Sequence, residues 1–427
     1  MKKIIALLIS ILIMLFILAG CAQPVTPAEQ KSGKARETSP SVSQPELDRL
    51  AEGNTTFALD LFQLLKEQDG NFFYSPYSIS QALAMTYGGM RGETEKQTAA
   101  ALQFRLGQEQ LHAAFNRTDI DLNQRGQGAK GADGKGFRLN VVNAIWGRQG
   151  YQFTREYLDL LARNYGAGLR IVDYQAAPEQ SRRTINQWVA DQTENRIKDL
   201  LPQGSITSLT RLVLTNAIYF NAAWANRFEK AATQEGRFTL LNGDEVSLPM
   251  MKQYAENYRY TEGDGYQAIE LPYDGREISM IIILPGNGQH TSVESGLDYA
   301  KLNSLPARMK NAAVDLSLPK FRIETALNLN AYLKKLGMTD AFDPNKADLS
   351  GMNGNKELFI SDVVHKAFVA VDEAGTEAAA ATGVVAGITS MPTDIKQFTV
   401  DRPFIFLIRD NPTGTVLFLG RVLNPLQ

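Results

Sequence analysis

The stretch Glu373–Met391 most constrains what this chain can fold into. It reads EAGTEAAAATGVVAGITSM, contains no proline, and has Glu377 as its only charged residue after Ala374. Side chains of a strand alternate between two faces, and the even-numbered positions 376–388 are all small or apolar. Every backbone N–H there could join a ladder, although Ala and Gly are poor strand formers. The pattern is typical of a segment that lies outside a sheet and can enter it later.

Two other interpretations stay open for this stretch taken alone. It could be a flexible linker, or a helix, because the run Ala378–Ala381 favours helical structure. The flanks favour the strand. Val363–Val371 and Phe404–Ile408 are apolar runs of β type, and a turn and a further strand-like run follow the second of them.

Several motifs, in the same order along the chain, resemble those of the serpin family, inhibitors that trap serine proteases with a mobile reactive loop. The resemblance covers about Glu46 to Pro425 and has the character of a prokaryotic lipoprotein-type member. The segments that carry it are EAGTEAAAAT (373–382), NFFYSPYSI (71–79), ALAMTYGGMRGET (82–94), LTNAIYFNAAW (214–224), LSLPKF (316–321), VVHKAFVAVDEAGTEA (363–378) and DRPFIFLIRDNPTGTVLFLGRVLNP (401–425).

The resemblance implies one mixed α/β (α+β) domain over residues 46–427. The serpin fold has three mostly antiparallel β-sheets, about eight to nine helices and an exposed reactive loop, here at about 373–393. Apolar spacing predicts helices at 46–66, 79–90, 94–102, 184–201 and 326–336. Apolar runs predict strands at 140–146, 212–220 and 278–284.

The first 45 residues predict export and lipid attachment. Lys2 and Lys3 precede the apolar run Ile4–Ala19, and the sequence LAGC at 18–21 resembles a bacterial lipobox. We expect residues 1–20 to be a signal peptide, Cys21 to carry lipid, and residues 21–45 to be a flexible tether, because that stretch has almost no large apolar residue. The protein would then lie on the outer, extracellular side of a membrane. An uncleaved signal anchor is the alternative.

Catalytic and nucleotide-binding patterns are weak or missing. Gly126–Gly131 matches GxGxxG, but a polar run precedes it and a strand-like run follows it, so we interpret it as a surface loop. Neither HExxH nor GxSxG occurs, and His112 and His290 are predicted at the surface. A net charge of −2 does not favour nucleic acid. We therefore predict no catalysis, no cofactor and no metal. A hydrolase that uses His365 stays open on residue counts alone.

The resemblance also implies three groups of site residues. A buried polar cluster under the central sheet, the shutter, would comprise Ser75, Ser78, Asn216 and His365. The breach, where the loop begins to enter the sheet, would comprise Trp224, Lys320 and Glu373. The hinge would comprise Glu373, Gly375, Thr376, Glu377, Ala378, Ala379, Ala380 and Ala381. A static hydrogen-bonded cluster and independent surface charges are the alternatives.

The implied mechanism is suicide inhibition by a monomer. In the family the cleaved bond follows the seventeenth residue counted from the hinge glutamate, which gives Thr389–Ser390. No Lys, Arg, Phe, Tyr, Trp or Leu occurs between Ala374 and Ile395, so elastase-like or subtilisin-like proteases are the expected partners, with papain-like enzymes second. The alternative is a non-inhibitory serpin that acts as a carrier, storage protein or chaperone. Such members typically gain charge, proline or bulk in the hinge.

Overall fold

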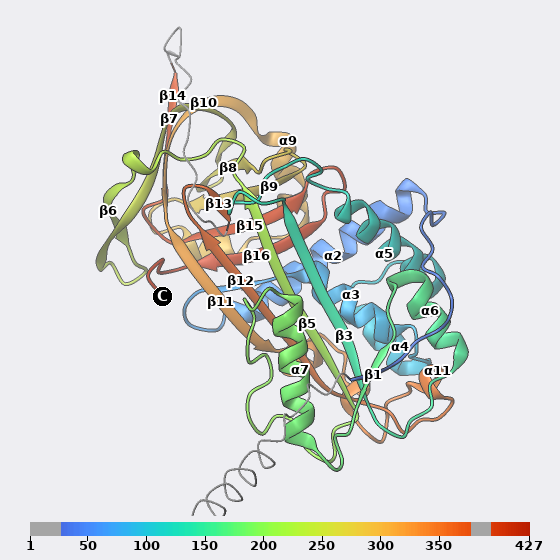
Figure 1. Ribbon diagram of the computed structural model, residues 1–427. Coiled ribbons are helices and arrows are strands. Elements are labelled where there is room, and N and C mark those ends of the chain that lie inside the picture. Colours follow the sequence, from blue (N-terminus) through green and yellow to red (C-terminus); the bar gives the residue numbers. More distant parts are fainter. Residues whose placement is uncertain (1–26, 377–393) are drawn as a thin grey trace, which may run out of the picture.

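Two β-sheets organise the described residues, 27–376 and 394–427, of the computed structural model (Figure 1). The first sheet has seven strands, in the order β1 (Ala28–Gln30), β4 (Leu169–Val172), β3 (Arg138–Arg148), β5 (Leu212–Ala223), β13 (Gly375–Thr376), β12 (Ile360–Val371) and β11 (Phe321–Asn328). The second has nine, in the order β14 (Ile395–Thr399), β10 (Lys310–Pro319), β7 (Glu245–Gly263), β8 (Tyr266–Pro272), β9 (Ile278–Pro285), β15 (Phe404–Asp410), β16 (Val416–Val422) and β2 (Phe72–Tyr74), with β6 (Gln234–Thr239) paired to β7.

Helices cover both faces of the first sheet. In Figure 1, α7 crosses one face over β3 and β5, while α2 to α6 gather on the other side. The α-helices of the described residues are α2 (Gln44–Leu65), α3 (Pro76–Tyr87), α4 (Gly92–Ala101), α5 (Gln108–Asn123), α6 (Arg155–Tyr165), α7 (Pro178–Gln192), α8 (His290–Ser295), α9 (Tyr299–Arg308), α10 (Asn330–Lys335) and α11 (Ser350–Asn353). The expected mixed fold is confirmed.

The described residues form two hydrogen-bonded sheets, where the resemblance implied three. β7 is 19 residues long, and it pairs with β6 through Glu245–Met250, with β10 through Met250–Tyr260 and with β8 through Arg259–Gly263. Because one continuous strand takes part in all three pairings, hydrogen bonds run unbroken from β14 to β2.

The centre of the first sheet is buried on both faces. All twelve residues of β5 are buried, as expected for an apolar run in a strand that is covered on both sides. Side chains of β3 and β5 alternate between two clusters. Trp146 and Val213 pack beneath α7 with Ile185, whereas Ile145 and Leu214 belong to the larger core that also includes α2 and α3.

Two predicted helices differ from the structure. The helix expected at 184–201 ends at Gln192, because Glu194, Asn195 and Asp199 have φ between 49° and 60° and cannot continue a right-handed helix. Within the helix expected at 326–336, residues 326–328 complete β11, whose alternating buried and exposed positions fit a half-buried strand. Only Asn330–Lys335 is helical there.

The segment predicted as a flexible tether packs against the domain from residue 27 onward. β1 pairs antiparallel with β4, aligning Ala28 with Ile171 and Gln30 with Leu169. Figure 1 shows the dark-blue chain continuing past α6 and α5 before α2 begins. The prediction rested on the scarcity of apolar residues, but strand pairing and ion pairing need none. Residues 1–26, including the predicted signal peptide and Cys21, lie outside the described residues.

All three histidines of the chain are buried, including the two that were predicted at the surface. His112 contacts the Tyr165 hydroxyl through Nδ1 at 2.7 Å, and burial lowers its pKa to about 4. Burial also lowers the pKa of His365 to about 3. Burial and nearby Arg421 lower the pKa of His290, although Glu294 at 3.8 Å opposes them. The polar residues around His290 predicted an exposed turn, yet the imidazole is buried.

These depressed pKa values predict that acid destabilises the fold. In the unfolded chain each imidazole binds a proton near pH 6.5, whereas the folded protein excludes that proton down to the lowered pKa. The unfolded state therefore binds more protons below pH 6.5. Between pH 7 and pH 5 the free energy of unfolding should fall by about 2 kcal/mol for each fully buried histidine. Urea unfolding at pH 7, 6 and 5 measures this loss.

His112→Gln provides the comparison, because this variant removes one of the titrating groups. Its stability should fall by about 2 kcal/mol less than that of the wild type over the same pH interval. Equal losses in the two proteins would contradict the role assigned to His112.

Candidate functional site

The first sheet contains a seam between β5 and β12 that is closed along most of its length. The two strands pair in parallel, from Ile360 opposite Leu212 to Phe368 opposite Tyr219. At one end β13 lies between them and runs antiparallel to both, with Thr376 opposite Ala222 on β5 and Val371 on β12. A chain that continued beyond Thr376 in this direction would have to separate β5 from β12.

Gly375 fits the entrance of the seam because it has no side chain. Its φ is +155°, and a Cβ atom at this position would lie 2.1 Å from the backbone oxygen of Ala222. Any other residue would push the backbone out of the gap between the two strands. The predicted hinge therefore enters the sheet at a position that only glycine tolerates.

Thr376 is fully buried, and its hydroxyl lies 2.7 Å from the hydroxyl of Tyr273. The Tyr273 ring stacks on Trp224, with ring centroids 4.6 Å apart and planes 10° apart. The Trp224 indole N–H donates to the backbone oxygen of Asp372 at 2.9 Å, and its backbone N–H donates to the oxygen of Ala374 at 3.0 Å. Trp224 therefore holds the start of the hinge while Tyr273 holds its first inward-facing side chain.

Lys320 and Glu373, predicted as an ion pair, meet at 2.9 Å. The Glu373 carboxylate is buried and also accepts a 2.9 Å hydrogen bond from the Thr233 hydroxyl. Burial alone would raise the pKa of Glu373, but the hydrogen bonds from Lys320 and Thr233 outweigh it, so the pKa lies below its usual value. Because the Lys320 side chain is 39% exposed, such a pair contributes about 0–1 kcal/mol. It orients the hinge more than it stabilises the fold.

The four residues predicted as a shutter lie together beneath the middle of the seam. His365 and Asn216 are opposite each other on β12 and β5, and His365 Nδ1 contacts Asn216 Oδ1 across the seam. Ser75 caps the N-terminus of α3, and its backbone N–H donates to His365 Nε2 at 3.2 Å. Nε2 therefore accepts, so the proton of this neutral imidazole lies on Nδ1 and points to Asn216. Asn216 Nδ2 in turn donates to the Ser78 hydroxyl.

Each strand thus keeps its own polar partner on α3. If the seam opened, His365 could remain bonded to Ser75, and Asn216 could remain bonded to Ser78. Among these side-chain bonds, only the one between His365 and Asn216 crosses the seam and would have to break, together with the backbone pairing of the two strands. Buried polar groups need partners throughout a rearrangement, and this arrangement limits the loss to one side-chain contact. That these residues act as a shutter stays a prediction.

Sequence reasoning missed several contributors. Asn143 on β3 belongs to the polar cluster, because its Nδ2 donates to Gln81 Oε1 at 2.9 Å and its Oδ1 accepts from the Ser78 hydroxyl at 3.2 Å. Its position two residues before buried Ile145 on an apolar strand was an available signal. Tyr273 and Thr233 carried no such signal, since their roles depend on contacts between distant segments.

Part of the predicted site lies outside the described residues. This applies to the predicted scissile pair and to the rest of the hinge: Thr389, Ser390, Glu377, Ala378, Ala379, Ala380 and Ala381. The flanks are described. Thr376 belongs to the first sheet, whereas Ile395 begins β14, which pairs in parallel with β10 in the second sheet. The two ends of the intervening segment are therefore fixed in different sheets.

Relatives of this chain span several groups of organisms. The human leukocyte elastase inhibitor is 42% identical over 390 residues, which cover 89% of this chain and 100% of the relative. An uncharacterized serpin-like protein of Thermococcus kodakarensis is 40% identical over 372 residues, 87% of this chain and 84% of that protein. The crystal structure of tengpin, a thermophilic serpin, in its native state matches with a TM-score of 0.83 and 30% identity, covering 94% of this chain and 100% of tengpin.

The predicted location requires correction. Leukocyte elastase inhibitors align over their full length, and nothing in that similarity supports a lipid anchor or an extracellular position, so the prediction of an exported, membrane-anchored protein is contradicted. It rested only on the first 21 residues, that is, on two lysines, an apolar run and the LAGC motif. Among the described residues, no helix has the length and apolar character needed to cross a bilayer.

A family-level match covers most of the chain. The model described as serpin (serine protease inhibitor) matches residues 52–425. Because the family inhibits proteases rather than catalysing a reaction, the prediction that this chain is not an enzyme is confirmed. The mixed α/β fold of the described residues agrees with this assignment. The chain belongs to the serpin family of serine protease inhibitors.

Proposed function

We propose that this chain inhibits serine-type endopeptidases by covalent trapping, with elastase-like or subtilisin-like enzymes as targets. The protease would cleave the segment between Thr376 and Ile395, and the freed part would enter the seam between β5 and β12. One observation carries this proposal: β13 already lies at the mouth of that seam, paired with both strands.

The chemical step uses the protease's own mechanism. The catalytic serine oxygen of the protease attacks the carbonyl carbon of Thr389, and the peptide bond to Ser390 breaks. The leaving nitrogen of Ser390 takes a proton and becomes the amino terminus of the downstream part, which stays attached to β14. The carbonyl of Thr389 remains bonded to the protease as an ester. Water must reach this ester for the protease to escape.

Cleavage at this bond would free thirteen residues, 377–389, on the side that is joined to the first sheet. An extended chain rises about 3.3 Å per residue, so the end that carries the protease could travel about 40 Å. The uncut segment could not move this far, because its other end is fixed in the second sheet at Ile395. Insertion would then carry the protease from one end of the seam to the other and distort its active site before the ester is hydrolysed.

The register of β13 supports this path. Thr376 lies opposite Ala222 and Val371, and the inserted chain would run antiparallel to both partners. Six residues further on, Thr382 would lie opposite residue 216 on β5 (222 − 6) and residue 365 on β12 (371 − 6). These residues are Asn216 and His365, which the structure itself places opposite each other.

Insertion would break the bond between His365 and Asn216. Thr382 would then lie between these two residues. Thr382 shares the parity of Thr376, whose side chain faces the core, so its hydroxyl would point toward the polar cluster. A hydroxyl can both donate and accept, and it could bond to His365 on one side and to Asn216 on the other. The neighbouring inward positions, Ala380 and Val384, are small and apolar, which suits a crowded sheet.

The target class follows from the residues offered for cleavage. Val384, Val385, Ala386, Ile388 and Thr389 are small or β-branched, whereas no Lys, Arg or large aromatic residue occurs between Ala374 and Ile395. Such side chains fit shallow apolar specificity pockets. The human relative is named an elastase inhibitor, which agrees with this class. Papain-like cysteine proteases are a second candidate, because Ile388 could fill their apolar subsite.

Incubation with proteases tests the proposed function directly. Equimolar elastase or subtilisin should yield a complex that survives boiling in detergent, and mass spectrometry should locate Thr389 at the junction. Trypsin should form no such complex, because the segment between Ala374 and Ile395 contains no Lys or Arg for trypsin to recognise. Stable complexes with trypsin and none with elastase or subtilisin would overturn the assignment. Clean cleavage by elastase and subtilisin without any complex would indicate a non-inhibitory serpin.

Cleavage should also stabilise the protein. The freed residues can pair with both β5 and β12, whereas a nick in an ordinary loop only removes contacts. A single cut within Val384–Ser390 should raise the thermal midpoint by roughly tens of degrees, which corresponds to about 10 kcal/mol or more for a domain of this size. Calorimetry of intact and cleaved protein measures the change. An unchanged or lower midpoint after a clean cut would contradict insertion.

Thr376→Arg should convert the inhibitor into a substrate. Trapping is a race between insertion and hydrolysis of the ester, and each 1.4 kcal/mol added to the insertion barrier slows insertion about tenfold. Thr376 is fully buried against Tyr273, so an arginine there would force an unpaired charge into the core. The variant should be cut at the same bond, but the protease should be released, as electrophoresis of the products would show.

Glu377→Arg is the matched control, because it introduces the same side chain one position later. That position has the opposite parity, so the arginine would face away from the core and trapping should persist. If both variants failed to trap, or neither did, the assignment of parity would be wrong.

A further inference from the structure

The N-terminal strap, which we define as residues 28–37, is bound along one edge of the molecule. β1 pairs with β4, the Ser32 hydroxyl bonds to Asp159 on α6, and the backbone N–H of Glu37 donates to the oxygen of Arg163 at 2.9 Å. The strap is therefore fixed to the first sheet at one end and to α6 further along. Arg36 and Glu37 are strap residues that contact α5.

Arg36 forms a close set of contacts with α5. Its Nε donates to Asn116 Oδ1 at 2.7 Å, and its Nη2 lies 2.6 Å from Asp119 Oδ2. The side chains of Arg36 and Asp119 are only 27% and 19% exposed. Asn116 is fully buried, and its Nδ2 returns a 2.8 Å hydrogen bond to the backbone oxygen of Glu37. The guanidinium therefore pairs with Oδ2 of the Asp119 carboxylate, which Asn123 Nδ2 also contacts at 3.3 Å.

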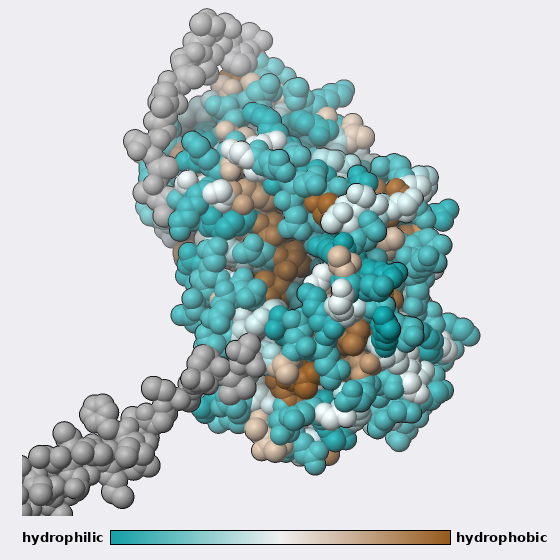
Figure 2. Space-filling view, turned by 45° about the vertical axis from the view of Figure 1, so that its right-hand side comes forward, coloured by the Kyte–Doolittle hydropathy of each residue, from teal (hydrophilic) through white to brown (hydrophobic). Residues whose placement is uncertain are grey.

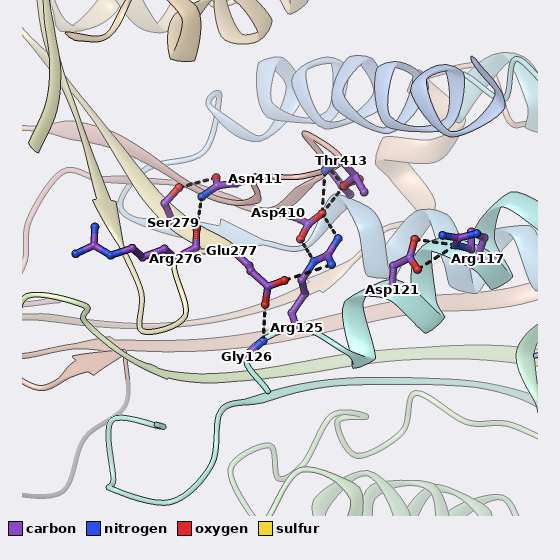
Figure 3. A network of polar contacts seen from close by, with 11 residues as sticks. Arg117, Asp121, Arg125, Gly126, Arg276, Glu277, Ser279, Asp410, Asn411 and Thr413 are labelled. Carbon is purple, nitrogen blue, oxygen red and sulfur yellow. Dashed lines mark hydrogen bonds and ion pairs between the residues drawn. The ribbon is translucent and has the colours of Figure 1, made fainter. Parts of the chain in front are cut away.

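The chain just after α5 is fixed independently of the strap, as Figure 3 shows. Arg125, two residues beyond the helix, bonds to the fully buried Asp410 at 2.7 Å and lies 3.5 Å from Glu277. Asp410 also accepts hydrogen bonds from Thr413, which anchor it in the turn between β15 and β16. α5 thus cannot easily move as a whole, so losing Arg36 would act on the Asp119 side chain rather than displace the helix.

A chain of hydrogen bonds leads from Asp119 to the seam. Gln81 Nε2 donates to Asp119 Oδ1 at 3.4 Å, and Gln81 Oε1 accepts from Asn143 Nδ2 at 2.9 Å. Asn143 Oδ1 then accepts from Asn216 Nδ2, and Asn216 Oδ1 contacts His365. Five successive side-chain contacts thus connect Arg36 on the strap with His365 on β12.

A cavity of about 250 Å³ beside this chain leaves its members room to change partners. Its lining includes Arg36, Asp119, Gln81 and Asn143, together with Leu139 and Val141 of β3. Figure 2 turns the side of the molecule with α5 and α6 forward, and shows a mostly hydrophilic face with hydrophobic groups gathered in a hollow near its middle. Side chains that border a cavity can rotate without first displacing packed neighbours.

We propose that Arg36 is a positioning residue for the polar cluster, through which the strap keeps the seam between β5 and β12 closed. While Arg36 neutralises Asp119, Gln81 can orient its amide to hold Asn143. Without Arg36, the partly buried carboxylate would attract the Gln81 NH₂ group more strongly, and Gln81 would turn away from Asn143. Asn143 would then no longer orient Asn216 toward His365. The consequence for protease trapping rests on the proposed function, but the coupling itself does not.

Hydrogen–deuterium exchange of the full chain tests the coupling without any protease. In Arg36→Ala, amides of β5 and β12 near Asn216 and His365 should exchange about twofold to thirtyfold faster than in the wild type, the range typical of coupling through side-chain networks. Arg36→Lys keeps a cation beside Asp119 and should restore most of the protection. Acceleration confined to the strap and β4, with the seam unchanged, would overturn the proposal.

Two further variants separate coupling from simple loosening of the strap. Ser32→Ala removes the contact with Asp159, which lies outside the chain of hydrogen bonds, so the seam should keep its wild-type exchange. Gln81→Met interrupts the chain at its middle while the strap stays bound. Adding Arg36→Ala to Gln81→Met should then cause no further change in the exchange rates of the seam amides, because the effects of substitutions at coupled residues are not additive. Additive effects would contradict a shared path.

This design also separates the two proposals. If the wild-type protein trapped no protease but Arg36→Ala accelerated exchange at the seam, the proposed function would fail while the coupling stood. If trapping occurred and the seam was insensitive to Arg36, only the coupling would fail. Thermal unfolding of each variant confirms that the comparison is made between folded proteins.

Discussion

The pairing of β5 with β12 is the contact on which the rest of the structure depends. It is a parallel pairing, which is slightly weaker per residue than an antiparallel one, at the centre of a sheet that is covered on both faces. At one end β13 already pairs with both strands in the antiparallel direction. The sheet is thus stable as it stands, yet it offers a longer antiparallel strand a better set of backbone partners.

The buried polar groups at this seam need hydrogen-bond partners, but they also make it easier for the two strands to separate. Burying His365, Asn216 and two serines requires that every group find a partner, and an apolar cluster of the same volume would pack without that constraint. The partners here are divided between the strands, since Ser75 bonds to His365 and Ser78 bonds to Asn216. With the strands apart, the cluster would lose only the contact between His365 and Asn216, whereas a closely packed apolar cluster would be left with a void.

The sequence predicted the parts of this arrangement that lie in short, characteristic segments. The small-residue stretch after Glu373, the apolar run of β5 and the SPYS and VVHKA segments were sufficient to name Thr376, Ser75, Ser78, Asn216 and His365. Contacts between distant segments were not predictable in this way. Tyr273 meets Thr376, and Arg36 meets Asp119, only because the chain folds.

The errors also have physical explanations. Composition indicates whether a segment can bury apolar surface, and by that measure residues 27–45 should be unstructured. Their order comes instead from backbone pairing at a sheet edge and from a guanidinium that meets a carboxylate. The predicted helix ends early, at Gln192, because Glu194, Asn195 and Asp199 beyond it adopt left-handed conformations that depend on the surroundings as well as on residue type.

β1 has a consequence for how the molecule behaves among its own copies. It is the outermost strand at one edge of the first sheet, it spans only three residues, and it carries the charge of Glu29. Short, charged edge strands resist pairing with strands of other molecules, whereas β4 without it would offer the unpaired backbone of Leu169–Val172. The strap therefore protects solubility as well: it covers an edge through which one sheet could otherwise extend into the next and start a fibre.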